Sequence, residues 1–68
     1  MRGDLRETVD SWCRARGYRL FVHHPAGSDY EASIWKDREM LYSGKPSDDP
    51  YFTIEDVLRI AVEAEGGN

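Results

Sequence analysis

Two stretches with apolar residues at helical spacing lie near the two ends of this chain, and a strand-like stretch separates them. The apolar stripe of the first stretch consists of Leu5, Val9, Trp12 and Cys13. The stripe of the second stretch consists of Ile54, Val57, Leu58, Ala61 and Val62. Such stripes predict amphipathic helices. Because each stripe has to be buried against another layer, the chain is constrained to pack both helices on its central stretch.

Capping residues set the expected ends of the two helices. Asp4 is the predicted N-cap of a helix over residues 5–16, and Gly17 is its predicted stop. Thr53 is the predicted N-cap of the second helix, which is expected to end at residues 66–67, a Gly-Gly pair.

Three segments between the helices are rich in strand-forming residues and are bounded by turn residues. They predict strands over residues 18–24, 30–36 and 39–43, with the last two joined by a two-residue hairpin at Asp37-Arg38. The expected fold is α+β in the order α-β-β-β-α. It is one domain over residues 1–68, with a three-stranded antiparallel sheet and both helices on one face.

The hairpin also predicts which side chains share a face of the sheet. It pairs Trp35 with Met40 and Ile34 with Leu41. Ala32, Ile34 and Leu41 then face the helices, and the opposite face carries Phe21, Trp35, Met40 and Tyr42. An open apolar face would mark a contact surface. Two alternatives stay open: the loop over residues 44–52 covers this face with Tyr51 and Phe52, or a one-residue shift places these side chains in the core.

Charge is distributed unevenly along the chain, whose net charge is −4. Residues 1–24 hold five Arg against three acids, whereas residues 25–68 hold four basic residues against ten acids. Acidic residues of the second part that could engage a basic partner are Asp29, Glu31, Asp37, Glu39, Asp48, Asp49, Glu55 and Asp56. Trp35 and Tyr42 are candidate anchors of the same interface. An ordinary solvated surface is the alternative interpretation.

The sequence offers no motif for catalysis, metal binding or a cofactor. Cys13 lies on the apolar stripe of the first helix and is predicted to be a buried hydrophobe. His23 and His24 are adjacent on a strand, so their side chains are expected to diverge. The acidic pairs of residues 48–49 and 55–56 occur where loops and helix starts favour acids. We therefore expect no enzyme, no metal site and no cofactor.

The cellular setting is also predicted from what the sequence lacks. The first residues contain no apolar segment of the kind that secretory signals carry, and no apolar run is long enough to span a bilayer. One cysteine allows no internal disulfide. These features predict a cytoplasmic protein with no membrane attachment, either a monomer or a weak dimer.

The expected element order resembles the double-stranded-RNA-binding fold. That family carries a Lys-rich motif at the start of its second helix, whereas this chain has Thr53-Ile54-Glu55-Asp56 there. The resemblance therefore extends to topology without the basic motif that contacts RNA.

In size and acidity the chain is similar to small phage-encoded inhibitors of host defence, notably anti-CRISPR proteins. This resemblance implies binding to a Cas subunit at its DNA-binding surface, through the acidic residues named above and without direct contact to nucleic acid. The alternatives are a nucleic-acid-binding module that uses Arg14, Arg16 and Arg19, and a small oligomerisation or accessory domain.

Overall fold

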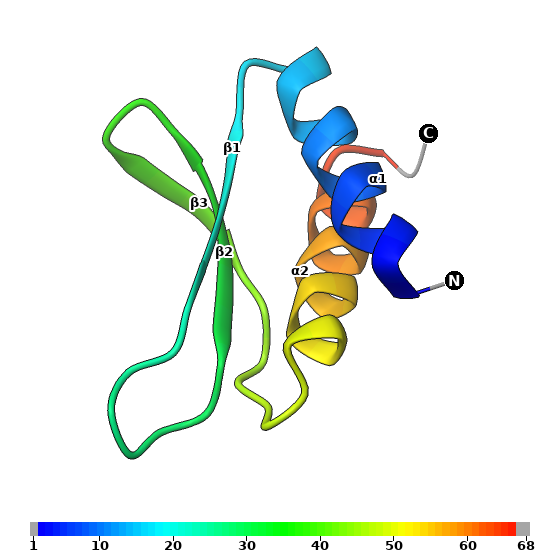
Figure 1. Ribbon diagram of the computed structural model, residues 1–68. Coiled ribbons are helices and arrows are strands. Elements are labelled where there is room, and N and C mark those ends of the chain that lie inside the picture. Colours follow the sequence, from blue (N-terminus) through cyan, green and yellow to red (C-terminus); the bar gives the residue numbers. More distant parts are fainter. Residues whose placement is uncertain (1, 67–68) are drawn as a thin grey trace.

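Two helices cover one face of a three-stranded sheet (Figure 1). The computed structural model describes the backbone of residues 2–66 and the side chains of residues 4–66. In chain order the elements are α1 (Arg2–Ala15), β1 (Arg19–His23), β2 (Glu31–Lys36), β3 (Glu39–Ser43) and α2 (Pro50–Ala64). The strands are antiparallel in the order β1-β2-β3. The predicted α+β class and α-β-β-β-α order are confirmed.

Helix α1 ends where the sequence predicts, but it begins three residues earlier. Gly17 has a φ of 76°, which a residue without a Cβ adopts without strain. The N–H groups of Gly17 and Tyr18 donate to the carbonyls of Arg14 and Cys13, the paired bonds of a Schellman ending. Because α1 begins at Arg2, Asp4 lies inside the first turn and is not the cap.

Helix α2 is capped by Asp49, and the prediction of Thr53 as the N-cap is wrong. The Asp49 carboxylate accepts a hydrogen bond from the Tyr51 N–H, and Pro50 occupies the first helical position. Proline fits there because its missing N–H would have no intrahelical partner. The helix ends at Ala64, Gly66 follows with a φ of 100°, and Gly67 lies outside the described residues. Within residues 2–66, neither helix is both long and apolar enough to cross a bilayer.

The core lies between the sheet and the two helices. Its buried apolar side chains are Val9, Cys13, Ala32, Ile34, Ile54, Val57 and Ala61. Thr53 is also fully buried, and its hydroxyl accepts a hydrogen bond from the Ala32 N–H at 3.1 Å. The carbonyl of Ala32 accepts from the Gly44 N–H at 2.9 Å. The Thr53 side chain on α2 thus provides an acceptor for a backbone N–H of β2 at the position just beyond the end of β3.

The β2–β3 pairing contains a bulge that the sequence analysis missed. Trp35 faces Met40 as predicted, but Ile34 faces Tyr42, and the register shifts between Ile34 and Trp35. Leu41 is the extra residue of β3 at this point. The predicted pairing of Ile34 with Leu41 is therefore wrong, and Tyr42 lies on the helix side, where it packs against the core.

The connection from β3 to α2 runs beside β2 and leaves the other face of the sheet open. Ser47 forms an isolated bridge with Tyr30, with N···O distances of 2.8 and 3.1 Å. Phe21 and Met40 on the outer face remain 52% and 50% exposed. The alternative in which the loop over residues 44–52 covers the outer face is therefore wrong. Within that face the prediction holds for Phe21, Trp35 and Met40 and fails for Tyr42.

We predict that replacing Thr53 by valine destabilises the fold by about 1–3 kcal/mol, because the buried Ala32 N–H loses its acceptor. Urea denaturation measures the loss, and hydrogen exchange should show faster exchange at the Ala32 amide. Thr53→Ser is the matched control, since it keeps the hydroxyl and removes one methyl group, which costs about 1 kcal/mol. Unchanged protection of the Ala32 amide in Thr53→Val would contradict the role assigned to this hydroxyl.

Candidate functional site

The predicted acidic residues do not form one continuous surface. Asp37 and Glu39 lie at the β2–β3 turn, at one end of the sheet (Figure 1). The other predicted acids lie toward the opposite end, at the start of β2, in the loops before β2 and after β3, and in the first two turns of α2. They are Asp29, Glu31, Asp48, Asp49, Glu55 and Asp56. We call this second group, together with Asp4 at the start of α1, the acidic end.

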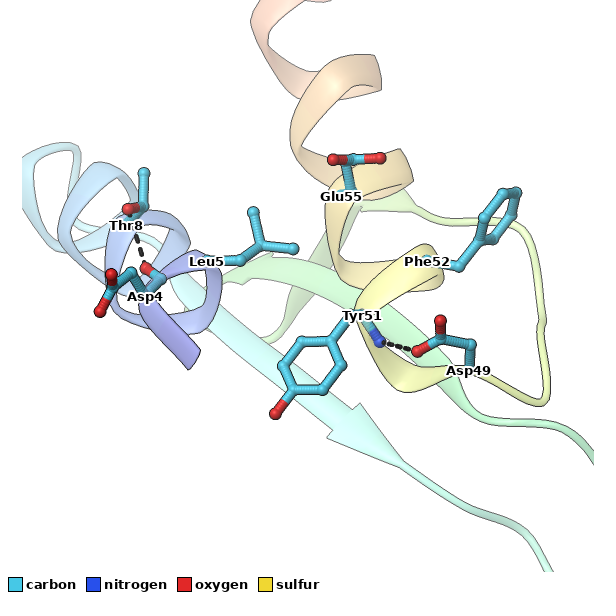
Figure 2. Close-up of a pocket in the computed structure, with 7 residues that line it drawn as sticks. All are labelled: Asp4, Leu5, Thr8, Asp49, Tyr51, Phe52 and Glu55. Atoms are coloured by element: carbon cyan, nitrogen blue, oxygen red, sulfur yellow. Dashed lines mark hydrogen bonds between the residues drawn. The ribbon is translucent and has the colours of Figure 1, made fainter. Parts of the chain in front are cut away.

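A groove at the acidic end has a volume of about 550 Å³. It is lined by Asp4, Leu5, Thr8, Asp49, Tyr51, Phe52 and Glu55. Figure 2 shows Leu5 reaching from α1 toward α2, while Tyr51 and Phe52 diverge from the first turn of α2. Phe52 is 49% exposed. Three carboxylates from separate parts of the chain thus surround a partly aromatic hollow.

The first turns of both helices support negative charge in this groove. A helix N-terminus carries a partial positive charge from its unpaired N–H groups. Asp4 lies in the first turn of α1, and Asp49 is the cap of α2. Asp4 was expected only as a helix cap, so its place in the groove was missed. The order of elements contained the signal, because three antiparallel strands between two helices make both helices begin at the same end.

Asp56 has a structural role that limits its availability to a partner. Its carboxylate accepts from the Lys45 N–H at 2.8 Å and from the Arg59 guanidinium at 2.6 Å. The hydrogen bond from the Lys45 backbone, followed by that from Arg59, holds the pKa of Asp56 below its usual range. Asp56 therefore fixes the loop after β3 to α2, and Glu55 beside it remains exposed.

Tyr42, a predicted anchor, is engaged in a cluster on the helix side of the sheet. The hydroxyls of Tyr42 and Tyr18 donate to the same Glu65 oxygen at 2.8 and 2.6 Å. The other Glu65 oxygen lies 3.5 Å from the Arg16 guanidinium. The bonds from Tyr18 and then Tyr42 lower the pKa of Glu65, and the bond to Glu65 raises the pKa of both tyrosines. This cluster joins the end of α2 to β3 and to the end of α1.

Trp35, the other predicted anchor, lies on the open face of the sheet. Its indole N–H donates to the Ser33 hydroxyl at 2.8 Å. A shallow hollow of about 220 Å³ lies beside it, lined by Arg19, Phe21, Trp35 and Asp37. This hollow shares no lining residue with the groove at the acidic end, so the structure does not bring Trp35 together with Glu55.

Cys13 and the two histidines show no arrangement that would activate a nucleophile. Cys13 is buried as predicted, and loss of solvent, followed by the nearby Asp10, raises the pKa of its thiol to about 11. The thiol therefore stays protonated at neutral pH. His23 lies 3.4 Å from Glu31, whereas His24 stacks on Tyr30. Among the side chains of residues 4–66, no three His, Cys, Asp or Glu groups lie close enough to hold a metal ion.

The three arginines proposed for nucleic-acid binding lie where α1 meets β1. Arg16 lies 4.0 Å from the centre of the Trp12 ring and is paired with Glu65. Arg14 and Arg19 line a second hollow together with Asp10. One of the three guanidiniums is thus already engaged by an aromatic ring and a carboxylate.

No family model, curated protein or solved structure matches this chain. The resemblances to anti-CRISPR proteins and to the double-stranded-RNA-binding family therefore stay predictions.

The Glu65 cluster predicts a specific dependence of stability on pH. Because the pKa of Glu65 is lower in the folded state, its contribution is present above the usual glutamate pKa and is lost as pH falls through the folded value. The stability difference between wild type and Glu65→Gln should therefore shrink in acid. The tyrosines act in the opposite sense: their raised pKa values predict stability that is lost as pH rises through those values.

Urea denaturation at a series of pH values measures this effect. Glu63→Gln is the control, since Glu63 lies two residues earlier in the last turn of α2 and its side chain contacts only Arg59 among the described interactions, at 3.5 Å. An acid-side pH profile of Glu65→Gln parallel to that of wild type would show that the cluster does not stabilise the fold.

Proposed function

We propose that this chain acts by binding, without catalysis, and that its acidic end attaches to a basic surface of a protein partner. The observation that carries the proposal is the groove that Asp4, Asp49 and Glu55 line together with the exposed Phe52 and the partly buried Tyr51. The more specific form of the proposal is an inhibitor that occupies the nucleic-acid-binding surface of a CRISPR-Cas subunit.

The chemistry of the groove suits a lysine or arginine side chain. Carboxylates form short, charge-assisted hydrogen bonds with guanidinium and ammonium groups. Aromatic rings such as that of Phe52, which is 49% exposed, attract the same cations over their faces. The apolar side chain of Leu5 and the alkyl part of an arginine can pack together in the same hollow. All three kinds of group line the same hollow, so a basic side chain that enters it can contact a carboxylate together with either Leu5 or Phe52.

The placement of charge also favours a partner that normally binds nucleic acid. Proteins that bind DNA neutralise phosphates with Lys and Arg arranged in a groove. The acidic end offers carboxylates on α1, on α2 and in the loops beside them, so several basic side chains can be engaged at once. Complementary charge of this kind steers association and excludes partners of like charge. Binding would displace DNA by occupying the groups that hold its phosphates.

A competition assay tests the proposal. Purified CRISPR surveillance complexes and Cas nucleases are loaded with fluorescent target DNA, and the chain is added at low and at high salt. We expect displacement of DNA that weakens as salt rises. Glu55→Lys should weaken the competition about tenfold or more, equivalent to about 1.4 kcal/mol, because a positive charge would enter the groove.

Glu63→Lys is the matched control, since it makes the same charge change on an exposed side chain later in α2. It should have little effect. Equal losses in the two variants would show that only net charge matters, which contradicts a defined site. Displacement from another basic nucleic-acid-binding protein, but from no Cas protein, would retain the acidic site and overturn the CRISPR-Cas form. A shift of free DNA by the chain in a low-salt gel would favour the nucleic-acid-binding alternative.

A further inference from the structure

The open face of the sheet carries apolar side chains where water would be expected to favour polar ones. Arg19, Trp35 and Met40 lie opposite one another across the three strands. Phe21 lies on the same face, beside Ser33. An antiparallel sheet with one solvated face usually alternates apolar residues inward and polar residues outward. Here the outer face instead presents Phe21 and Met40 about half exposed, which marks it as a contact surface.

The aromatic part of this face is held in place before any partner binds. The indole N–H of Trp35 is satisfied by the Ser33 hydroxyl at 2.8 Å, so the ring can be covered without leaving an unpaired polar group. Ser33 is itself buried, although it lies on the open face. The Phe21 ring lies 5.3 Å from the His23 ring. A surface that is already ordered loses less side-chain entropy on binding.

The charges around this surface indicate what covers it. Arg19 and Asp37 flank the hollow beside Phe21 and Trp35. At the other end of the face, His23 lies 3.4 Å from Glu31. Beside this hollow the face carries one guanidinium and one carboxylate, Arg19 and Asp37, whereas the acidic end gathers carboxylates. A single-stranded nucleic acid would stack on the rings but needs a basic groove as well, and a basic protein would meet Arg19. A second copy of the same face matches this pair, because a two-fold axis presents the same patch on both copies and can set Arg19 of one copy opposite Asp37 of the other.

We propose that this face is the interface of a homodimer in which two sheets pack against each other. The helices lie on the opposite side of each sheet (Figure 1), so the groove at the acidic end stays accessible in both copies. Three strands of five or six residues give a face of roughly 14 by 18 Å. This is smaller than a standard interface of about 800 Å² per partner, so the dimer is weak and concentration-dependent.

Sedimentation velocity over a range from about 1 µM to about 1 mM tests the proposal, because so small an interface gives a weak dimer. The mean mass of wild type should rise from 7.8 kDa toward twice that value. Phe21→Ser should weaken the dimer at least tenfold. Phe52→Ser is the matched control, because Phe52 is equally exposed but lies on α2, and it should leave the dimer unchanged.

A charge series carries the test independently if Phe21→Ser fails to fold. Arg19→Glu leaves the face with acidic groups in excess and should weaken the dimer, whereas Arg14→Glu makes the same charge change on α1 and should not. The double variant Arg19→Asp, Asp37→Arg exchanges the two charges and should restore dimerisation toward that of wild type. A wild-type mass of 7.8 kDa at all concentrations, or equal weakening by Phe21→Ser and Phe52→Ser, would overturn the proposal. Neither result bears on the competition assay, which depends on the acidic end.

Discussion

The contact between Thr53 and Ala32 determines how the two halves of this fold fit together. Strand β3 ends before it reaches the residues that begin β2. The Thr53 hydroxyl of α2 therefore accepts the hydrogen bond from the Ala32 N–H in β2. Gly44 fits at the same point because a Cβ there would lie 2.4 Å from the Thr53 carbonyl oxygen. The close approach of the chain to α2 directs the following loop along β2, and this route leaves the other face of the sheet uncovered.

The parallel course of the two helices has the strongest influence on the electrostatics of the surface. Their first turns lie at one end of the molecule, where the partial positive charge of each N-terminus offsets the cost of gathering carboxylates. Some of these acids also hold the fold together: Asp49 caps α2, and Asp56 fixes the loop through Lys45 and Arg59. Glu55 has no such role among the described contacts, which makes it the most informative position for separating binding from stability.

The order of elements, the β2–β3 turn and the buried Cys13 could be predicted because each depends on residues close together in sequence. Asp37 adopts a φ of 56° at the turn, a conformation that aspartate tolerates better than most residues. The bulge could not be predicted, because Leu41 and Tyr42 are both apolar and either could face the helices. The contacts that Tyr42 makes on the helix side are distant in sequence: it packs against the core, and its hydroxyl donates to Glu65, 23 residues away. The N-cap of α2 could have been predicted from Pro50, which is favoured at the first position of a helix. Whether the outer face is covered could not be predicted, because it depends on the course of the loop after β3, and no local sequence pattern specifies that course.

The burial of Cys13 has a consequence for how the folded state can be observed. Its thiol lies among side chains from α1, the sheet and α2, and with a pKa of about 11 it is almost entirely in the unreactive protonated form. A thiol reagent can therefore react readily only after an opening of the structure that exposes Cys13. The rate at which this thiol is modified therefore reports how often such openings occur. No probe has to be introduced into the chain for this measurement.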